Sequence, residues 1–327
     1  GRTTLSWQGA RMLARPEPRT GAVSLLPADY LLALYNIILI AVWTPLAATS
    51  DVARWMIVVH LAALTLPWLL VQAGEVRSRP VVVLRDVYPM LWLTAMWREL
   101  GIHTELVGSA PNDALLAWLD RRLFGVNLSA TWAPTMPMGW FSELMQCVYF
   151  LYYAAFVGLV LYFLIFRSRS IVRDVTLRLS AAYAAAYIVY AIAPTVGPMM
   201  MPEFSRFGGE GAHGLFRILN DALQAAGDAA GTAFPSTHVA GVVTLAWLAW
   251  RYCPQWVAWL VTALAISVGP ATVYTQNHFL LDAVGGAVLA LWLQAGLVPM
   301  LDKAYRAALL QRLRRAAASL ETEPEAA

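Results

Sequence analysis

The chain has 327 residues, of which 59% are hydrophobic and 13% are charged, and its formal net charge is +3. Soluble domains carry about 25% charged residues, so this composition excludes an ordinary soluble protein and predicts an all-α, polytopic helical membrane protein. The weak net charge gives no reason to expect a nucleic-acid partner.

Helical segments that cross a bilayer need about 20 apolar residues. The stretch 80–100 has this length but is interrupted by Arg85 and Asp86, so we expect a broken or tilted span or a re-entrant element. The other candidates are 29–49, 53–72, 139–165, 173–195, 238–252, 255–275 and 279–300.

Basic residues in short loops predict which side of the membrane each loop faces, because Lys and Arg mark the cytoplasmic side. The basic clusters are Arg2 to Arg19, Arg77 with Arg79, Arg167 to Arg173, Arg251, and Lys303 to Arg315. If 80–100 crosses, all of them fall on one side, in about eight crossings of roughly bilayer length with both termini cytoplasmic. Loops 101–138, 196–237 and 273–278 then face the extracytoplasmic side.

The order of apolar spans and charged segments divides the chain into three parts. Residues 1–28 form a cytoplasmic N-terminal segment without the features of a signal peptide. Residues 29–302 form a single membrane domain, and 303–327 form a cytoplasmic basic amphipathic helix followed by an acidic tail.

The outer loops contain two amphipathic stretches, 112–124 and 213–226, which predict interfacial helices. The first has Leu115, Leu116, Leu119 and Leu123 on one side and Asp113, Asp120 and Arg121 on the other. The second has Leu215, Ile218, Leu219 and Leu223 against Arg217 and Asp221. Padding of the loops and gating of a substrate are equally good interpretations.

Two histidine-containing motifs carry the candidate chemistry. The first is Phe234-Pro235-Ser236-Thr237-His238, and the second contains His278 and Asp282. Residues four apart on a helix share a face, so a carboxylate at 282 can hold the His278 imidazole in one tautomer and orientation. Two histidines and one carboxylate suit a two-step transfer of a phosphoryl-type group through a histidine adduct. We expect no metal and no cofactor.

The remaining histidines and the cysteines have simpler interpretations. His60 lies in the middle of a span and is expected to be a hydrogen-bonded core residue, whereas His103 and His213 are expected at the surface. Cys147 and Cys253 lie in or beside apolar segments and are expected to be free, buried thiols.

The two motifs together resemble the PAP2 (type 2 phosphatidic acid phosphatase) superfamily. The resemblance rests on Phe-Pro-Ser-Thr-His at 234–238, Val-Tyr-Thr-Gln-Asn-His-Phe-Leu-Leu-Asp at 273–282, and Gly285-Gly286. With Tyr274, His278, Phe279 and Asp282 in place, the pattern is most similar to the inositol phosphorylceramide synthases of the Aur1 kind, enzymes of sphingolipid metabolism. The segment Pro194-x-x-Gly197-Pro198 extends the resemblance through the C-terminal half. It implies a six-helix PAP2-like core with extra N-terminal helices and interfacial helices.

The resemblance implies a role for each residue of the motifs. His278 would be the nucleophile that attacks the phosphorus of a lipid phosphate, and Asp282 would orient it. His238 would protonate the leaving oxygen and then deprotonate the acceptor. Ser236 and the backbone amides near Thr237 would bind the non-bridging phosphate oxygens, as a helix N-terminus can.

Several positions depart from the phosphatases of the superfamily. Thr237 stands where they usually have Gly, Ala271 and Thr272 stand where they have a Ser-Arg pair, and a Lys-x6-Arg-Pro motif is absent. Other cations must then meet the phosphate charge, and the candidates are Arg98, Arg206 and Arg217, with Arg98 the first to test.

Three functions remain open. The departures are shared by the transferase branch, which favours a lipid phosphotransferase that moves a phospho-headgroup from a phospholipid to a hydroxyl acceptor through a phosphohistidine. The alternative is a phosphatase of the same fold that acts on a polyprenyl or diacylglycerol phosphate. The third is a non-catalytic transporter with the His and Asp residues as a proton relay. All three have a lipid or membrane-borne substrate and a membrane-embedded chain.

Overall fold

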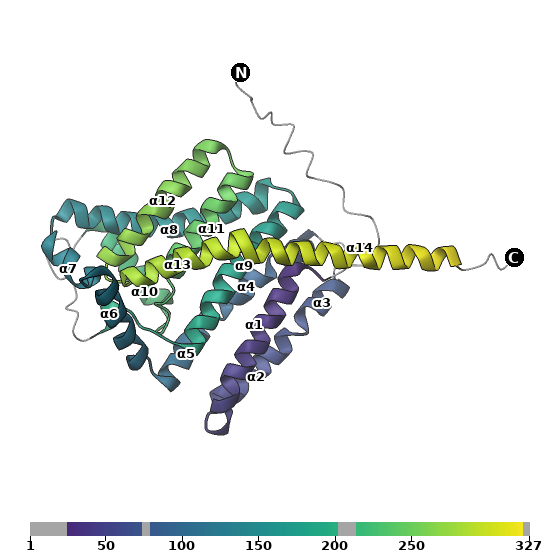
Figure 1. The fold of residues 1–327 in the computed structure, drawn as a ribbon, viewed down its shortest axis with the longest axis horizontal. Coiled ribbons are helices and arrows are strands. Elements are labelled where there is room, and N and C mark those ends of the chain that lie inside the picture. The colour runs from purple at the N-terminus through teal and green to yellow at the C-terminus, as the bar shows by residue number, and fades with distance from the viewer. Residues whose placement is uncertain (1–24, 74–78, 202–213, 323–327) are drawn as a thin grey trace, which may run out of the picture.

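The computed structural model describes residues 25–73, 79–201 and 214–322, and in these ranges its elements are helices and not strands (Figure 1). The all-α prediction is therefore confirmed. Most of the predicted segment 1–28, Arg77, Arg206, His213 and the end of the acidic tail lie outside the described residues. The elements are α1 (Pro27–Trp43), η1 (Thr44–Ala48), α2 (Asp51–Ala63), α3 (Leu66–Ala73), α4 (Arg79–Ala95), α5 (Trp97–Val107), α6 (Ala110–Phe124), α7 (Leu128–Thr135), α8 (Gly139–Phe166), α9 (Arg169–Ile192), η3 (Pro198–Met200), α10 (Leu215–Gly227), α11 (Thr237–Tyr252), α12 (Gln255–Tyr274), α13 (Leu280–Trp292), η5 (Leu293–Leu297) and α14 (Val298–Thr322).

The chain is an integral, multi-pass membrane protein. Within the described ranges, 6 helical stretches are long and apolar enough to cross a bilayer: Pro27–Ala48, Asp51–Gln72, Gly139–Phe166, Arg169–Ile192, Gln255–Tyr274 and Leu280–Arg312. Helix α4 has 17 residues and α11 has 16, which is short for a span. The eight-crossing topology needs both of them as spans and stays a prediction.

The break predicted within 80–100 occurs at a different residue. Helix α4 runs through Arg85 and Asp86 and ends at Ala95, and α5 begins at Trp97. The charged pair does not interrupt the helix, because both side chains are neutralised by partners. Arg85 donates two hydrogen bonds to Asp29 of α1, and Asp86 accepts from Arg169 and Arg173 of α9. These charges join α4 to its neighbours.

Helices α9, α11 and α13 form the centre of the bundle that positions the candidate site (Figure 1). Small residues let α11 and α13 cross closely. A Cβ added to Gly286 of α13 would lie 2.3 Å from the carbonyl oxygen of Ser236, at the start of α11. The crossing therefore brings the two predicted motifs together.

Both amphipathic stretches are helical, and the two sides of the first have different surroundings. In α6 the carboxylates of Asp113 and Asp120 are buried, whereas Leu115 and Leu123 are exposed. The two carboxylates face the protein, where they accept the N–H groups of Val196, in the loop after α9, and of Leu281, in the first turn of α13. The exposed leucines suit contact with lipid rather than water.

The C-terminal helices form one continuous rod. Helices α13, η5 and α14 follow each other without a loop, and α14 protrudes from the bundle (Figure 1). The helix therefore continues through residue 302, where the sequence suggests a boundary between the membrane domain and the cytoplasmic part. That boundary stays a prediction.

Candidate active site

Two imidazoles from distant parts of the chain meet at one end of the bundle. Nδ1 of His238 lies 3.4 Å from Nε2 of His278, and the ring centroids are 5.6 Å apart. His238 is in the first turn of α11, and His278 precedes the start of α13. The structure thus brings together the two histidines that the sequence singles out.

A tight turn between α12 and α13 positions His278. The backbone N–H groups of Asn277 and His278 both donate to the carbonyl oxygen of Thr272, and Gln276 has a positive φ of 62°. Phe279 is the N-cap of α13, so His278 and Asp282 do not share a continuous helix, contrary to the expectation from their spacing. They nevertheless face each other, because the turn folds the imidazole back over the first turn of α13.

Asp282 contacts the side of the His278 ring that points away from His238. Its Oδ2 lies 3.5 Å from Nδ1 of His278 and accepts a 2.8 Å hydrogen bond from the backbone N–H of Phe279. Asp282 is fully buried, and its Oδ1 has no hydrogen-bond partner in the structure. A buried carboxylate in this position favours a proton on Nδ1 of His278, which leaves the Nε2 lone pair directed at His238.

Two tyrosines hold the other side of His238. The hydroxyls of Tyr149 and Tyr153 on α8 lie 3.0 and 2.9 Å from Nε2 of His238. When one of these hydroxyls donates to Nε2, the proton of the neutral ring is on Nδ1, where it faces His278. Neither tyrosine was predicted from the sequence. Their spacing of four residues on one helix was the available signal.

Ser236 and Thr237 occupy different environments. Ser236 is fully buried and is the N-cap of α11: its Oγ accepts from Val239 N, and its own N–H donates to the carbonyl oxygen of Asp282 at 3.0 Å. The backbone of Ser236 therefore links the first motif to the second by a hydrogen bond. Thr237, beside His238, lines the cavity described below.

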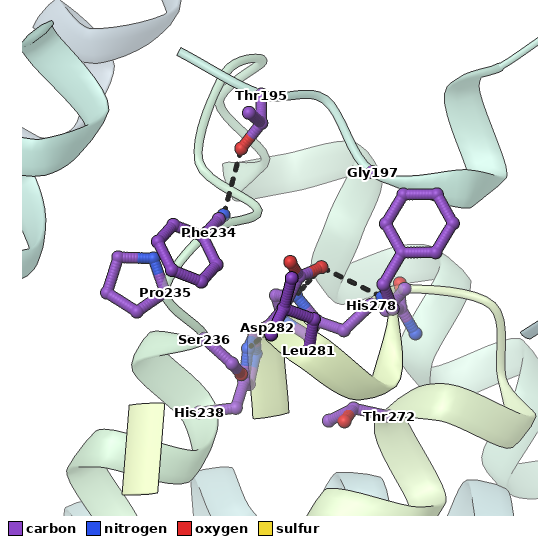
Figure 2. A network of polar contacts seen from close by, with 12 residues as sticks. Thr195, Gly197, Phe234, Pro235, Ser236, His238, Thr272, His278, Leu281 and Asp282 are labelled. Carbon is purple, nitrogen blue, oxygen red and sulfur yellow. Dashed lines mark hydrogen bonds and ion pairs between the residues drawn. The ribbon is translucent and has the colours of Figure 1, made fainter. Parts of the chain in front are cut away.

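The loop before α11 is held by the loop after α9. Thr195 Oγ1 accepts a 2.9 Å hydrogen bond from the N–H of Phe234, and Thr195 forms a parallel bridge with Thr232 (Figure 2). Gly197 has a φ of 79°, and a Cβ there would lie 2.9 Å from the carbonyl oxygen of Asn277. The Pro194-x-x-Gly197-Pro198 segment thus contacts both motif loops.

A cavity of about 380 Å³ opens in front of the histidines. Aromatic side chains of α5, α8 and α9 form much of its wall, and Gln224, Asp228 and Asn277 add polar groups. Gln224 donates to Asn277 Oδ1 at 2.6 Å, next to His278. Withdrawal from water raises the pKa of Asp228 above its usual range, and the backbone N–H of Ala229 opposes the shift. None of these three residues was predicted from the sequence to belong to the site.

The candidate cations lie away from the histidines or outside the described chain. Arg98 is exposed on α5 and does not line the cavity, and Arg217 pairs with Asp221 at 2.8 Å. Arg206 lies outside the described residues. The structure therefore does not bring Arg98 or Arg217 to the site.

The remaining sequence expectations concern residues outside the cavity. His60 is a buried, hydrogen-bonded core residue as predicted, with Nε2 2.7 Å from Glu99. His103 is also buried, against Trp43, so its expected surface position is wrong. Cys147 and Cys253 are free and half-buried.

Comparison with known proteins gives one match. The family model described as the PAP2 superfamily matches residues 114–295, more than half of the chain. The matched range includes both histidine motifs and the helices that pack around them. No curated protein and no solved structure gives a significant match.

Proposed function

The chain belongs to the PAP2 superfamily, and we propose that it is a membrane-embedded lipid phosphotransferase. Membership supports an activity of the phosphatase or phosphotransferase type. In the proposed reaction, a phospho-headgroup moves from a phospholipid donor to a hydroxyl acceptor through a phosphohistidine at His278. The observation that carries this proposal is the 3.4 Å approach of His238 Nδ1 to His278 Nε2 at the wall of a cavity.

The first step forms the histidine adduct. Nε2 of His278 attacks the phosphorus, and the bond from phosphorus to the oxygen of the departing lipid alcohol breaks. Nδ1–H of His238 gives its proton to that oxygen. Asp282, on the far side of the ring, stabilises the positive charge that develops on His278.

The second step reverses these proton transfers. The acceptor hydroxyl loses its proton to Nδ1 of His238 while its oxygen attacks the phosphorus, and the bond from phosphorus to Nε2 of His278 breaks. Both steps use the same two nitrogens. The backbone N–H groups at the start of α11, next to Thr237, are our candidates for binding the non-bridging oxygens, and Ser236 holds that helix start in place.

The character of the cavity favours transfer over hydrolysis. An alcohol acceptor competes with water, so a transferase needs a site from which water is largely excluded. Aromatic and aliphatic side chains such as Tyr152, Tyr187 and Leu179 line most of the cavity. Thr237 and the pair Ala271 and Thr272 support a place in the branch of the inositol phosphorylceramide synthases, which are transferases.

The proposed site would face the extracytoplasmic side, with both termini cytoplasmic. His238 and His278 precede or begin helices that run away from the same end of the bundle. Arg167, between α8 and α9, contacts the C-terminal end of α11, and the basic residues of α14 follow the C-terminal end of α13. Positive residues at this end of the helices are typical of the cytoplasmic side. Labelling of a single cysteine introduced in either region of intact cells tests this orientation.

Product analysis tests the proposed reaction. The purified protein is reconstituted in vesicles with a phospholipid donor and a ceramide or long-chain alcohol, with EDTA present, and the lipids are identified by mass spectrometry. We expect a new phospholipid in the wild type and none in His278→Ala. An alkaline quench should preserve a labelled phosphohistidine in the wild type. Free phosphate released in a parallel assay with diacylglycerol phosphate, without a new lipid from the phospholipid donor, would assign the phosphatase. Neither product in either assay would leave the transporter hypothesis.

A further inference from the structure

The charges around the cavity do not suit a doubly negative substrate. In the described part of the chain, neither Lys nor Arg lines the cavity, and Asp228 is the one carboxylate that does. A phosphomonoester carries up to two negative charges near neutral pH. Its binding would place those charges beside a carboxylate without a cationic side chain to oppose them, which is unfavourable in a site withdrawn from water. A phosphodiester carries one negative charge fewer.

Asp228 is a carboxylate without a cationic partner among the described residues. It follows the last residue of α10, and its Oδ1 accepts a 3.0 Å hydrogen bond from the N–H of Ala229. Two carboxylates of neighbouring elements have partners of their own: Asp221 of α10 pairs with Arg217, and Asp120 of α6 accepts the N–H of Leu281. Asp228 lines the same cavity as His278, Tyr149 and Tyr153, so the carboxylate shares one space with the reacting histidine.

Aromatic rings border the same part of the cavity. Nε1–H of Trp97 donates to the carbonyl oxygen of Gly227 at 2.6 Å, which holds the indole next to the residue that precedes Asp228. The Trp97 ring lies 5.5 Å from that of Tyr187, and both line the cavity. A carboxylate together with Trp and Tyr rings is the combination that binds ammonium groups, through charge pairing and cation–π attraction.

We propose that the donor is a phosphodiester lipid whose headgroup carries a positively charged ammonium, and that Asp228 recognises this group. The inference rests on the proposed function and specifies its substrate class. The ammonium lies toward Asp228 and the Trp97 wall, and the phosphorus lies at His278. The bond from phosphorus to the diacylglycerol oxygen breaks, and the headgroup stays on the phosphorus throughout. The zwitterionic donor then brings its own counter-charge into a cavity whose described wall has neither Lys nor Arg.

A competing role for Asp228 is electrostatic support of His278. That role would act on every donor equally, because His278 reacts with the phosphorus whatever the headgroup is. Headgroup recognition instead changes the ratio of the specificity constants of two donors. The ratio is therefore the decisive quantity.

The experiment compares donors with identical acyl chains in reconstituted vesicles of otherwise neutral lipid. The donors are phosphatidylcholine, phosphatidylethanolamine, phosphatidylglycerol and phosphatidic acid, each with the same alcohol acceptor. For the wild type we expect kcat/KM to be at least about tenfold higher for the two ammonium lipids than for phosphatidylglycerol, with phosphatidic acid poorest.

Asp228→Asn keeps the shape of the side chain and its acceptor for Ala229 but removes the charge. It should lower kcat/KM for phosphatidylcholine by about tenfold while leaving phosphatidylglycerol within about twofold of wild type. The matched control is Asp221→Asn, which removes the same charge from an exposed residue of α10 that does not line the cavity. It should leave all four donors unchanged.

The outcomes separate the two proposals. Equal loss with all donors in Asp228→Asn, or a wild-type preference for phosphatidylglycerol or phosphatidic acid, would overturn the headgroup assignment while the transferase stands. Absence of any new lipid with these four donors and with phosphatidylinositol would overturn the proposed function itself. A selective loss with the ammonium lipids supports both.

Discussion

Oδ1 of Asp120 accepts a 2.9 Å hydrogen bond from the backbone N–H of Leu281, a residue 161 positions further along the chain. Leu281 lies in the first turn of α13, between His278 and Asp282. A carboxylate at a helix N-terminus satisfies a backbone N–H group that has no partner within the helix and interacts favourably with the helix dipole. Helix α6 therefore holds the loop that presents His278.

Removal of this carboxylate should loosen the site. We expect Asp120→Ala to lower the free energy of unfolding by about 1–3 kcal/mol, because a buried N–H group loses its acceptor. Activity should fall as well, since His278 is adjacent. The matched control is Arg122→Ala, an exposed residue of the same helix, which should change neither. Thermal unfolding in detergent and product formation measure the two effects, and equal behaviour of both variants would contradict the assigned role.

Tyr149 and Tyr153 should act together on the tautomer of His238. Each hydroxyl lies within hydrogen-bond distance of Nε2, so either one can donate alone. We expect Tyr149→Phe and Tyr153→Phe to lower kcat by about 2- to 10-fold each, the worth of one neutral hydrogen bond. The double variant should lose more than the product of the two and shift the pH profile of kcat/KM. Tyr152→Phe, whose hydroxyl contacts Tyr183, is the control.

Asp282→Asn probes the charge that faces His278 without removing the helix cap. The amide oxygen of Asn can still accept from the N–H of Phe279, as Oδ2 of Asp282 does. We therefore expect a folded protein whose substrate affinity is retained and whose kcat falls by about 10²- to 10⁴-fold, because Nδ1 of His278 loses its anionic partner. Measurement of donor binding beside turnover checks this split. A variant as active as the wild type would show that His278 needs no counter-charge.

Headgroup selectivity should depend on pH through Asp228. Withdrawal from water raises the pKa of this carboxyl above its ordinary value of 3.8. The carboxyl is charged above its pKa and neutral below it, so attraction for an ammonium weakens as the pH falls toward the raised value. We expect the ratio of kcat/KM for phosphatidylcholine and phosphatidylglycerol to decline on acidification in the wild type. In Asp228→Asn the ratio should stay constant across the same range.

The sequence predicts the centre of the site better than its surroundings. His238, His278 and Asp282 were found because two short motifs each combine a histidine with turn residues at the start of an apolar helix. The contact of Tyr149 and Tyr153 with His238 was not predicted. Aromatic residues are common in membrane helices, and the spacing of the two tyrosines does not reveal which neighbour they face.

The orientation of α6 shows a second limit of sequence reasoning. The amphipathic pattern separates the leucines from the charged residues without showing which side faces the protein, and in the structure Asp113 and Asp120 face it. Their partners are backbone N–H groups of Val196 and Leu281, which carry no sequence signal. In a membrane protein the apolar side of such a helix can contact lipid, so the pattern alone does not decide which face is buried.

The close crossing of α11 and α13 gives a steric test of the whole arrangement. A Cβ at position 286 would lie 2.3 Å from the carbonyl oxygen of Ser236, and a backbone atom can yield only if the two helices separate. We expect Gly286→Ala to destabilise the protein by about 1–3 kcal/mol through overpacking. It should also lower kcat, because separation of α11 from α13 moves His238 away from His278.

Gly269→Ala on α12 is the control, since its nearest neighbour, the Cβ of Ala283, would be 3.9 Å away. Thermal unfolding and turnover of both variants decide the matter: a stable, fully active Gly286→Ala would mean that the helices do not cross this closely.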